Sequence, residues 1–120
     1  MTKKQNSTRY DLEERTLNFA KSVINFCKKL PKTVIEREIA KQLVRAATSV
    51  GANYIEANEA LGKKDFSMRI KICRKEAKES GYWLRLIELS NPDSMNEQEM
   101  LLKESTELTK IFSSILLKSQ

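Results

Sequence analysis

Residues 33–57 read TVIEREIAKQLVRAATSVGANYIEA, and their apolar side chains recur every three or four positions. This spacing puts the apolar residues on one face of an α-helix, as in a helix packed in a bundle. Thr33 and Glu36 have the spacing of a capping box, which marks a helix start. Gly51 lies mid-helix, where it costs about 1 kcal/mol relative to Ala, so we expect another helix to approach closely there. The apolar seam consists of Ile39, Leu43, Ala46, Val50, Tyr54 and Ala57.

Three further segments of the chain show the same spacing. The helix described above extends to about residue 61 and is the second along the chain. The four expected ranges are about 11–30, 33–61, 65–89 and 94–118. The fourth opens with a second capping box, Ser94 to Glu97. Short connections between long helices require antiparallel neighbours. The sequence therefore predicts an all-α fold, an antiparallel up-down-up-down four-helix bundle over residues 10–118, preceded by a disordered polar tail over residues 1–9.

The chain has 120 residues and no histidine. This excludes Ser–His and Cys–His nucleophile pairs and histidine-ligated zinc. There is no glycine-rich phosphate-binding loop either. Cys27 and Cys73 fall on apolar faces without paired spacing, which is typical of reduced core cysteines. We therefore expect no enzymatic activity, no cofactor and no bound metal.

No stretch of the sequence approaches the roughly 20 consecutive apolar residues that a membrane-spanning helix needs. Residues 1–7 contain lysines but no apolar run follows them, so they do not resemble a signal peptide. The expected location is the cytoplasm, away from membranes.

The third helix carries more apolar residues than the core of a monomeric bundle would use. Met68, Ile72, Trp83 and Leu86 fall roughly opposite its core seam, with Tyr82 at the edge. Soluble monomers usually avoid such a contiguous exposed patch, and Trp and Tyr are favoured anchors at protein interfaces. The pattern predicts self-association through this face. The alternative is that the N-terminal tail or an irregularly placed fourth helix covers it.

Basic residues gather on another flank of the same helix. Between Lys63 and Arg85 there are eight basic residues against three acidic ones, a net charge of +5 in a chain whose total is +6. The residues that share the flank, here called the basic stripe, are Lys63, Lys64, Lys71, Arg74, Lys78 and Arg85. Clustered cations on one helix face predict a site for nucleic-acid phosphates, although a solvated helix face has the same pattern. No module with stacking aromatics is recognisable, so contact with RNA or DNA would be mainly electrostatic.

A line of polar residues runs beside the seam of the second helix: Arg45, Ser49, Asn53 and Glu56. Together with the glutamates of the third helix, these residues could suggest a carboxylate metal site. Without histidine, and with Lys and Arg abundant, ion pairs and hydrogen bonds between helices are the preferred interpretation. Such polar pairs can also set the register of a bundle or an interface.

Three segments carry a resemblance to a known family: 42–57 (QLVRAATSVGANYIEA), 63–66 (KKDF) and 74–84 (RKEAKESGYWL). They resemble the signature of the four-helix-bundle proteins named after 23S rRNA intervening sequences. The resemblance implies a ring-like homo-oligomer, typically a pentamer. This family is similar to the accessory proteins of diversity-generating retroelements, basic pentameric bundles that bind nucleic acid and a reverse transcriptase. The chain departs from the pattern at Gly81, where related proteins have a bulkier or more polar residue, and this is expected to loosen the third helix.

These observations predict a non-enzymatic oligomeric scaffold that associates with nucleic acid through the basic stripe. RNA is preferred over DNA on the ground of the resemblance alone. The alternative is a protein adaptor that docks a partner enzyme, such as a reverse transcriptase, and has no nucleic-acid affinity of its own.

Overall fold

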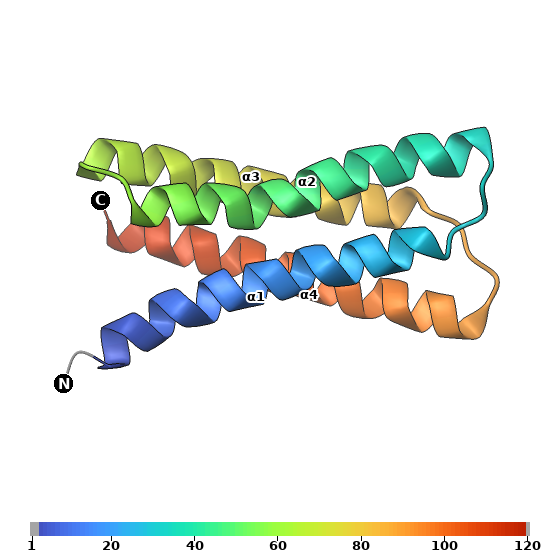
Figure 1. The fold of residues 1–120 in the computed structure, drawn as a ribbon, viewed down its shortest axis with the longest axis horizontal. Coiled ribbons are helices and arrows are strands. Elements are labelled where there is room, and N and C mark those ends of the chain that lie inside the picture. The colour runs from blue at the N-terminus through green and yellow to red at the C-terminus, as the bar shows by residue number, and fades with distance from the viewer. Residues whose placement is uncertain (1–2, 120) are drawn as a thin grey trace.

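The structure is a computed structural model that describes residues 3–119, with side-chain contacts described for residues 12–119. Four helices follow one another: α1 (Lys3–Lys28), α2 (Val34–Asn58), α3 (Lys63–Leu86) and α4 (Pro92–Lys118). Figure 1 shows that each helix runs antiparallel to the next, and that both chain ends lie at the same end of the elongated bundle. Its dimensions are 47 × 26 × 19 Å. The predicted all-α four-helix bundle is confirmed.

The first helix begins at Lys3, earlier than the expected start near Asp11. Residues 3–10 contain neither Pro nor Gly, so nothing in their sequence stops the helix from extending toward the N-terminus. Most of the segment predicted to be a disordered tail is therefore helical in the structure, and residues 1–2 lie outside the described range.

The core lies along the axis of the bundle, where the four apolar seams meet. Phe26, Leu43, Ile70, Leu84 and Phe112, which come from all four helices, are fully buried. Burying a side chain of this size stabilises the fold by roughly 1.5–3 kcal/mol. The seams predicted from spacing are buried except near the helix ends and toward the end of α4, where side chains such as Ile39, Phe66 and Ile115 are half-buried against the core.

Two glycines mark close contacts between helices. A Cβ added to Gly51 would lie 3.0 Å from the Oγ1 atom of Thr16, so α1 and α2 approach closely there, as predicted. A Cβ added to Gly81 would lie 3.0 Å from the Oγ atom of Ser105 in α4. The expectation that Gly81 loosens the third helix stays a prediction: α3 runs unbroken through this position, and the small residue leaves room for α4.

The helix starts follow local capping chemistry. The Thr33 hydroxyl accepts the backbone N–H of Glu36 at 3.3 Å, as the capping box predicts, and it also donates to the Glu36 carboxylate. The predicted start of the fourth helix at Ser94 is wrong. The side-chain oxygen of Asn91 accepts the N–H groups of Asp93 and Ser94 at 2.8 and 3.2 Å, and Pro92 occupies the first turn, where its fixed φ is favourable.

Candidate nucleic-acid interface

The basic stripe runs along the length of α3. Its residues are exposed except Arg74, which is half-buried. Four of its members follow one another at intervals of seven residues: Lys64, Lys71, Lys78 and Arg85. Seven residues correspond to about 10.5 Å of helix rise and to nearly two full turns, so the row drifts by only about 20° per step. The result is an almost straight line of cations about 30 Å long on one side of α3.

Carboxylates do not neutralise the basic stripe. Within residues 12–119, none of its six side chains forms an ion pair, whereas Arg15 and Lys29 of α1 pair with Glu104 and Glu97 of α4 at 2.7 and 2.8 Å. The charge of the stripe is therefore free to act on a ligand, because an unpaired surface cation keeps its full attraction for phosphate.

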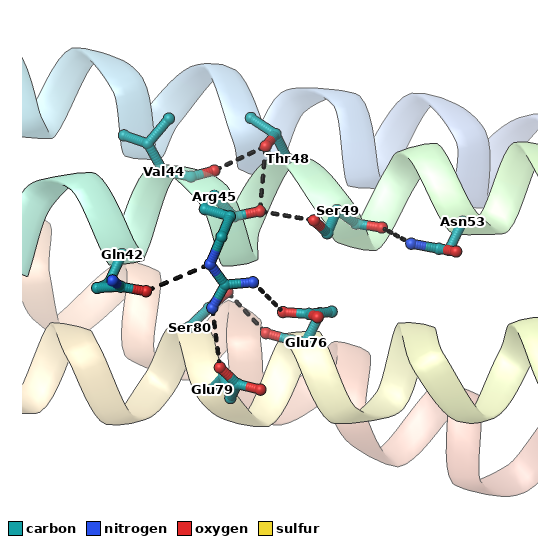
Figure 2. A network of polar contacts seen from close by, with 9 residues as sticks. All are labelled: Gln42, Val44, Arg45, Thr48, Ser49, Asn53, Glu76, Glu79 and Ser80. Atoms are coloured by element: carbon teal, nitrogen blue, oxygen red, sulfur yellow. Dashed lines mark hydrogen bonds and ion pairs between the residues drawn. The ribbon is translucent and has the colours of Figure 1, made fainter.

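Two of the three acidic residues of α3, Glu76 and Glu79, lie on its other flank, in a network with α2 that Figure 2 shows. Arg45 of α2 donates to Glu79 at 3.0 Å and, at the longer distance of 3.4 Å, to Glu76. The side chain of Glu76 is only 9% exposed, while that of Arg45 is 49% exposed. The arginine thus holds both carboxylates on the side of α3 that faces α2, away from the basic stripe.

The other members of the predicted polar line continue this network along α2. Ser49 donates to the carbonyl of Arg45 at 2.7 Å, and the amide of Asn53 donates to the carbonyl of Ser49 at 2.9 Å (Figure 2). The Asn53 side-chain oxygen accepts from Arg69 of α3 at 2.9 Å. Glu56 is exposed and takes no part in these contacts. Three of the four residues therefore join α2 to α3 or stabilise α2 itself.

A groove of about 360 Å³ opens between α3 and α4 beside the basic stripe. The residues that line it are Ser67, Lys71, Arg74, Ser113, Leu116, Leu117 and Ser119. Two cations and three hydroxyl groups can donate hydrogen bonds to anionic oxygens, although the Ser119 hydroxyl at present donates to the carbonyl of Leu116, and no carboxylate of residues 12–119 lines the groove. This combination suits a phosphate group. The groove between α1 and α4 is different, because Glu14 and Glu104 line it together with Arg15.

The apolar residues predicted to form an oligomer interface divide into two sets. Trp83 and Ile72 are half-buried, and Trp83 packs against the core. Met68, Tyr82 and Leu86 are 50%, 56% and 43% exposed. The exposed set is smaller than the predicted one because part of α3's second apolar side faces α2. The interface stays a prediction.

Trp83 lies at the contact between α2 and α3. The pairings of Arg45 with Glu76 and of Asn53 with Arg69 fix an antiparallel register that places Trp83 level with Ile39. Its indole nitrogen is buried and has no hydrogen-bond partner among the described residues.

Neither cysteine has the properties of a nucleophile. Burial raises the pKa of the Cys27 thiol to about 11 and that of the Cys73 thiol to about 12, so both stay protonated near neutral pH. The Cys73 thiol donates to the carbonyl of Val50 at 3.4 Å. Across the described residues, no group of three or more acidic, cysteine or histidine side chains is placed to hold a metal ion. None of the helices between residues 3 and 119 is long and apolar enough to span a bilayer.

Sequence reasoning missed the α4 side of the groove. On α4 the groove is lined by Ser113, Leu116 and Leu117, and Ser119 lines it just after the helix end. Ser113 and Leu117 are four positions apart, a spacing that places them on one helix face but does not indicate a binding site. The position of this face beside Lys71 and Arg74 depends on how α4 packs against α3, which the sequence pattern does not specify.

The fold and the site define a class of protein: a small antiparallel four-helix bundle with one cationic helix face. The sequence pattern of the 23S rRNA-intervening sequence protein family matches residues 9–114, and the chain belongs to this family. A solved structure from Bacteroides thetaiotaomicron VPI-5482, described as a protein with unknown function from the S23 ribosomal protein family, is 33% identical in sequence. The match covers 90% of this chain and 96% of that one, with a TM-score of 0.75. None of the curated proteins matches the chain.

Proposed function

We propose that this protein is a non-enzymatic scaffold that binds nucleic acid, preferably RNA, through the basic stripe of α3. The observation that carries the proposal is the line of six cations that no carboxylate pairs with among residues 12–119. The adjoining groove adds hydroxyl donors next to Lys71 and Arg74, which suits the several acceptor oxygens of a phosphate group. The family name, which refers to 23S rRNA, supports RNA over DNA.

The proposal includes self-association, in which repeated copies of the basic stripe would strengthen binding. Met68 and Leu86 supply exposed apolar area on α3, and the resemblance to the accessory proteins of diversity-generating retroelements, which rests on the sequence alone, would imply a pentamer. Linking several stripes in one particle converts later contacts into intramolecular ones, which raises the apparent affinity without new chemistry.

The test is the salt dependence of binding to a fluorescein-labelled single-stranded RNA, followed by fluorescence anisotropy. The triple variant Lys71→Glu, Arg74→Glu, Lys78→Glu should bind more weakly. Log K falls linearly as log salt rises. Each lost phosphate contact should make this line less steep by about 0.7, so three should make it less steep by about 2. A matched control reverses three exposed lysines elsewhere, Lys21, Lys28 and Lys110, with the same change in net charge.

Equal weakening by the control variant would mean that only net charge matters, and the stripe would not be the site. The same experiment tests the adaptor function, for which the exposed apolar side chains of α3 are the supporting observation. A protein partner that remains bound to the purified chain after nuclease treatment and high salt, together with absent RNA binding, would favour the adaptor instead.

A further inference from the structure

We infer that Tyr82 is a stacking platform for an unpaired base, so that the ligand of the basic stripe is single-stranded nucleic acid. This inference rests on the proposed function and adds the structural class of the ligand. It also assigns to Tyr82 a role that differs from the oligomer contact predicted from sequence.

The position of Tyr82 among the cations is the first argument. The residue follows Lys78 by four positions and precedes Arg85 by three, and residues at these spacings are surface neighbours on a helix. Its side chain is 56% exposed. An aromatic ring therefore projects from the same side of α3 as the two cations that flank it along the helix.

The second argument is that the ring is held in place. Tyr82 contacts Trp83 edge to face, with ring centroids 5.1 Å apart and planes at 73°. Trp83 is itself packed against the core. Less rotational freedom is lost when a ligand binds a ring that is already ordered, so such a ring is a better surface for stacking.

The third argument concerns what the ring and the cations can bind together. In a duplex the base faces are stacked on one another, whereas in a single strand they are free to stack on protein rings. Single-strand binding sites combine a cationic track for the backbone with aromatic side chains for the bases. The row of Lys64, Lys71, Lys78 and Arg85 supplies a straight track of about 30 Å.

Tyr82 is less suited to an interface between copies of the chain than its apolar neighbours Met68 and Leu86. Burying this ring against a second copy would also bring Lys78 and Arg85 toward the interface, and neither has a carboxylate partner within its own chain among the described residues. Desolvating these charges is unfavourable unless the second copy supplies carboxylates. A polyanion, in contrast, neutralises the cations while a base covers the ring.

The experiment compares two probes, a labelled single-stranded oligouridylate of about 12 nucleotides and an RNA duplex of the same length, a size within the range of known single-strand sites. Tyr82→Ala and Tyr82→Leu should each weaken single-strand binding at least about fivefold, because a stacked base is lost. Tyr82→Phe keeps the ring and should bind within about twofold of wild type. Duplex binding should not change in any of the three. The leucine variant keeps apolar bulk, so it also covers the case in which the alanine variant folds poorly.

Trp83 provides a second readout because it is the only tryptophan in the chain. Its fluorescence should change when the single strand binds next to Tyr82 and stay constant when the duplex binds. A matched control is Ile55→Ala, which removes a similarly exposed apolar side chain from α2, outside the basic stripe and the predicted oligomer interface. That variant should bind both probes as wild type does.

The outcomes separate the inference from the proposed function. If the Tyr82 variants bind the single strand normally while the charge-reversal triple variant is weakened, the stacking platform is refuted and the scaffold function stands. If Tyr82→Ala lowers the particle mass in light scattering, as an interface residue would, the inference is also overturned. If neither set of variants affects binding, the basic stripe is not the binding site, and both the proposed function and the inference that rests on it are refuted.

Discussion

Gly51 and Gly81 are helical glycines that a neighbouring helix approaches equally closely, yet their replacement by alanine should have opposite effects. In a helix interior, alanine is favoured over glycine by about 1 kcal/mol. At Gly51 the new Cβ would lie 3.0 Å from the Oγ1 atom and 3.3 Å from the Cβ of Thr16. At Gly81 it would meet only the Oγ of Ser105 at 3.0 Å, with the Ser105 Cβ at 3.9 Å.

Thr16 has little freedom to move away. Its side chain is fully buried, and its hydroxyl donates to the carbonyl of Leu12 at 2.7 Å. Rotation would leave the hydroxyl unpaired at a cost of about 1–3 kcal/mol, and overpacking without rotation costs a similar amount. We therefore expect Gly51→Ala to lower the free energy of unfolding by about 1 kcal/mol net. Ser105 is also buried, and its hydroxyl donates to the carbonyl of Leu102 at 2.9 Å. Its side chain is unbranched, however, so the hydroxyl can rotate toward the carbonyl four positions back in the preceding turn, and Gly81→Ala should stabilise by about 0.5 kcal/mol.

The assay is urea unfolding followed by circular dichroism, at one fixed protein concentration because assembly would shift the midpoint. Thr16→Ala removes the obstacle, so Gly51→Ala added to that background should stabilise by about 1 kcal/mol, a coupling of about 2 kcal/mol. The reasoning would be refuted if Gly51→Ala stabilised the wild-type chain as Gly81→Ala does, or if the double-mutant cycle showed no coupling.

Four further outcomes follow from contacts and burial described above. Asn91→Ala should lower the free energy of unfolding by about 1 kcal/mol, while Ser94→Ala should change it little; the reverse order in urea titrations would restore Ser94 as the cap. Arg45→Ala should destabilise by about 1 kcal/mol, because it leaves the buried Glu76 carboxylate unpaired, and Arg45→Lys should recover part of the loss; a neutral alanine variant would show that this contact, long at 3.4 Å, contributes nothing. In a variant whose only cysteine is Cys73, a thiol reagent at about pH 8 should react only after unfolding, because burial raises the thiol pKa to about 12; rapid labelling of the native protein would contradict this. The same shift makes the folded state hold its proton longer than the unfolded state, so stability should decline as pH rises from about 9 toward about 12.

The helices could be predicted from sequence because their apolar spacing is regular and their connections are short. Leu12, Phe19, Val23 and Phe26 of α1 are buried, as the apolar spacing of this segment indicates. Helix starts were less predictable, since Asn91 and Ser94 are both good capping residues and only the backbone geometry decides between them. The candidate site could be predicted only in part. Sequence periodicity places the cations on one flank, but it does not show which helix covers a half-buried residue such as Trp83, because that depends on packing between helices.

Arg45 has a consequence beyond holding two helices together. Glu79 lies four positions after Lys75, which borders the basic stripe, so without the arginine its carboxylate would be free to turn toward this lysine and offset its charge. Arg45 holds Glu79 on the flank of α3 that faces α2. It thereby preserves the positive electrostatic potential of the basic stripe, although Arg45 itself lies on α2 and faces away from the stripe. The strength of polyanion binding on α3 would then be set partly from another helix, and substitutions at Arg45 would change affinity at a distance without removing any contact to the ligand.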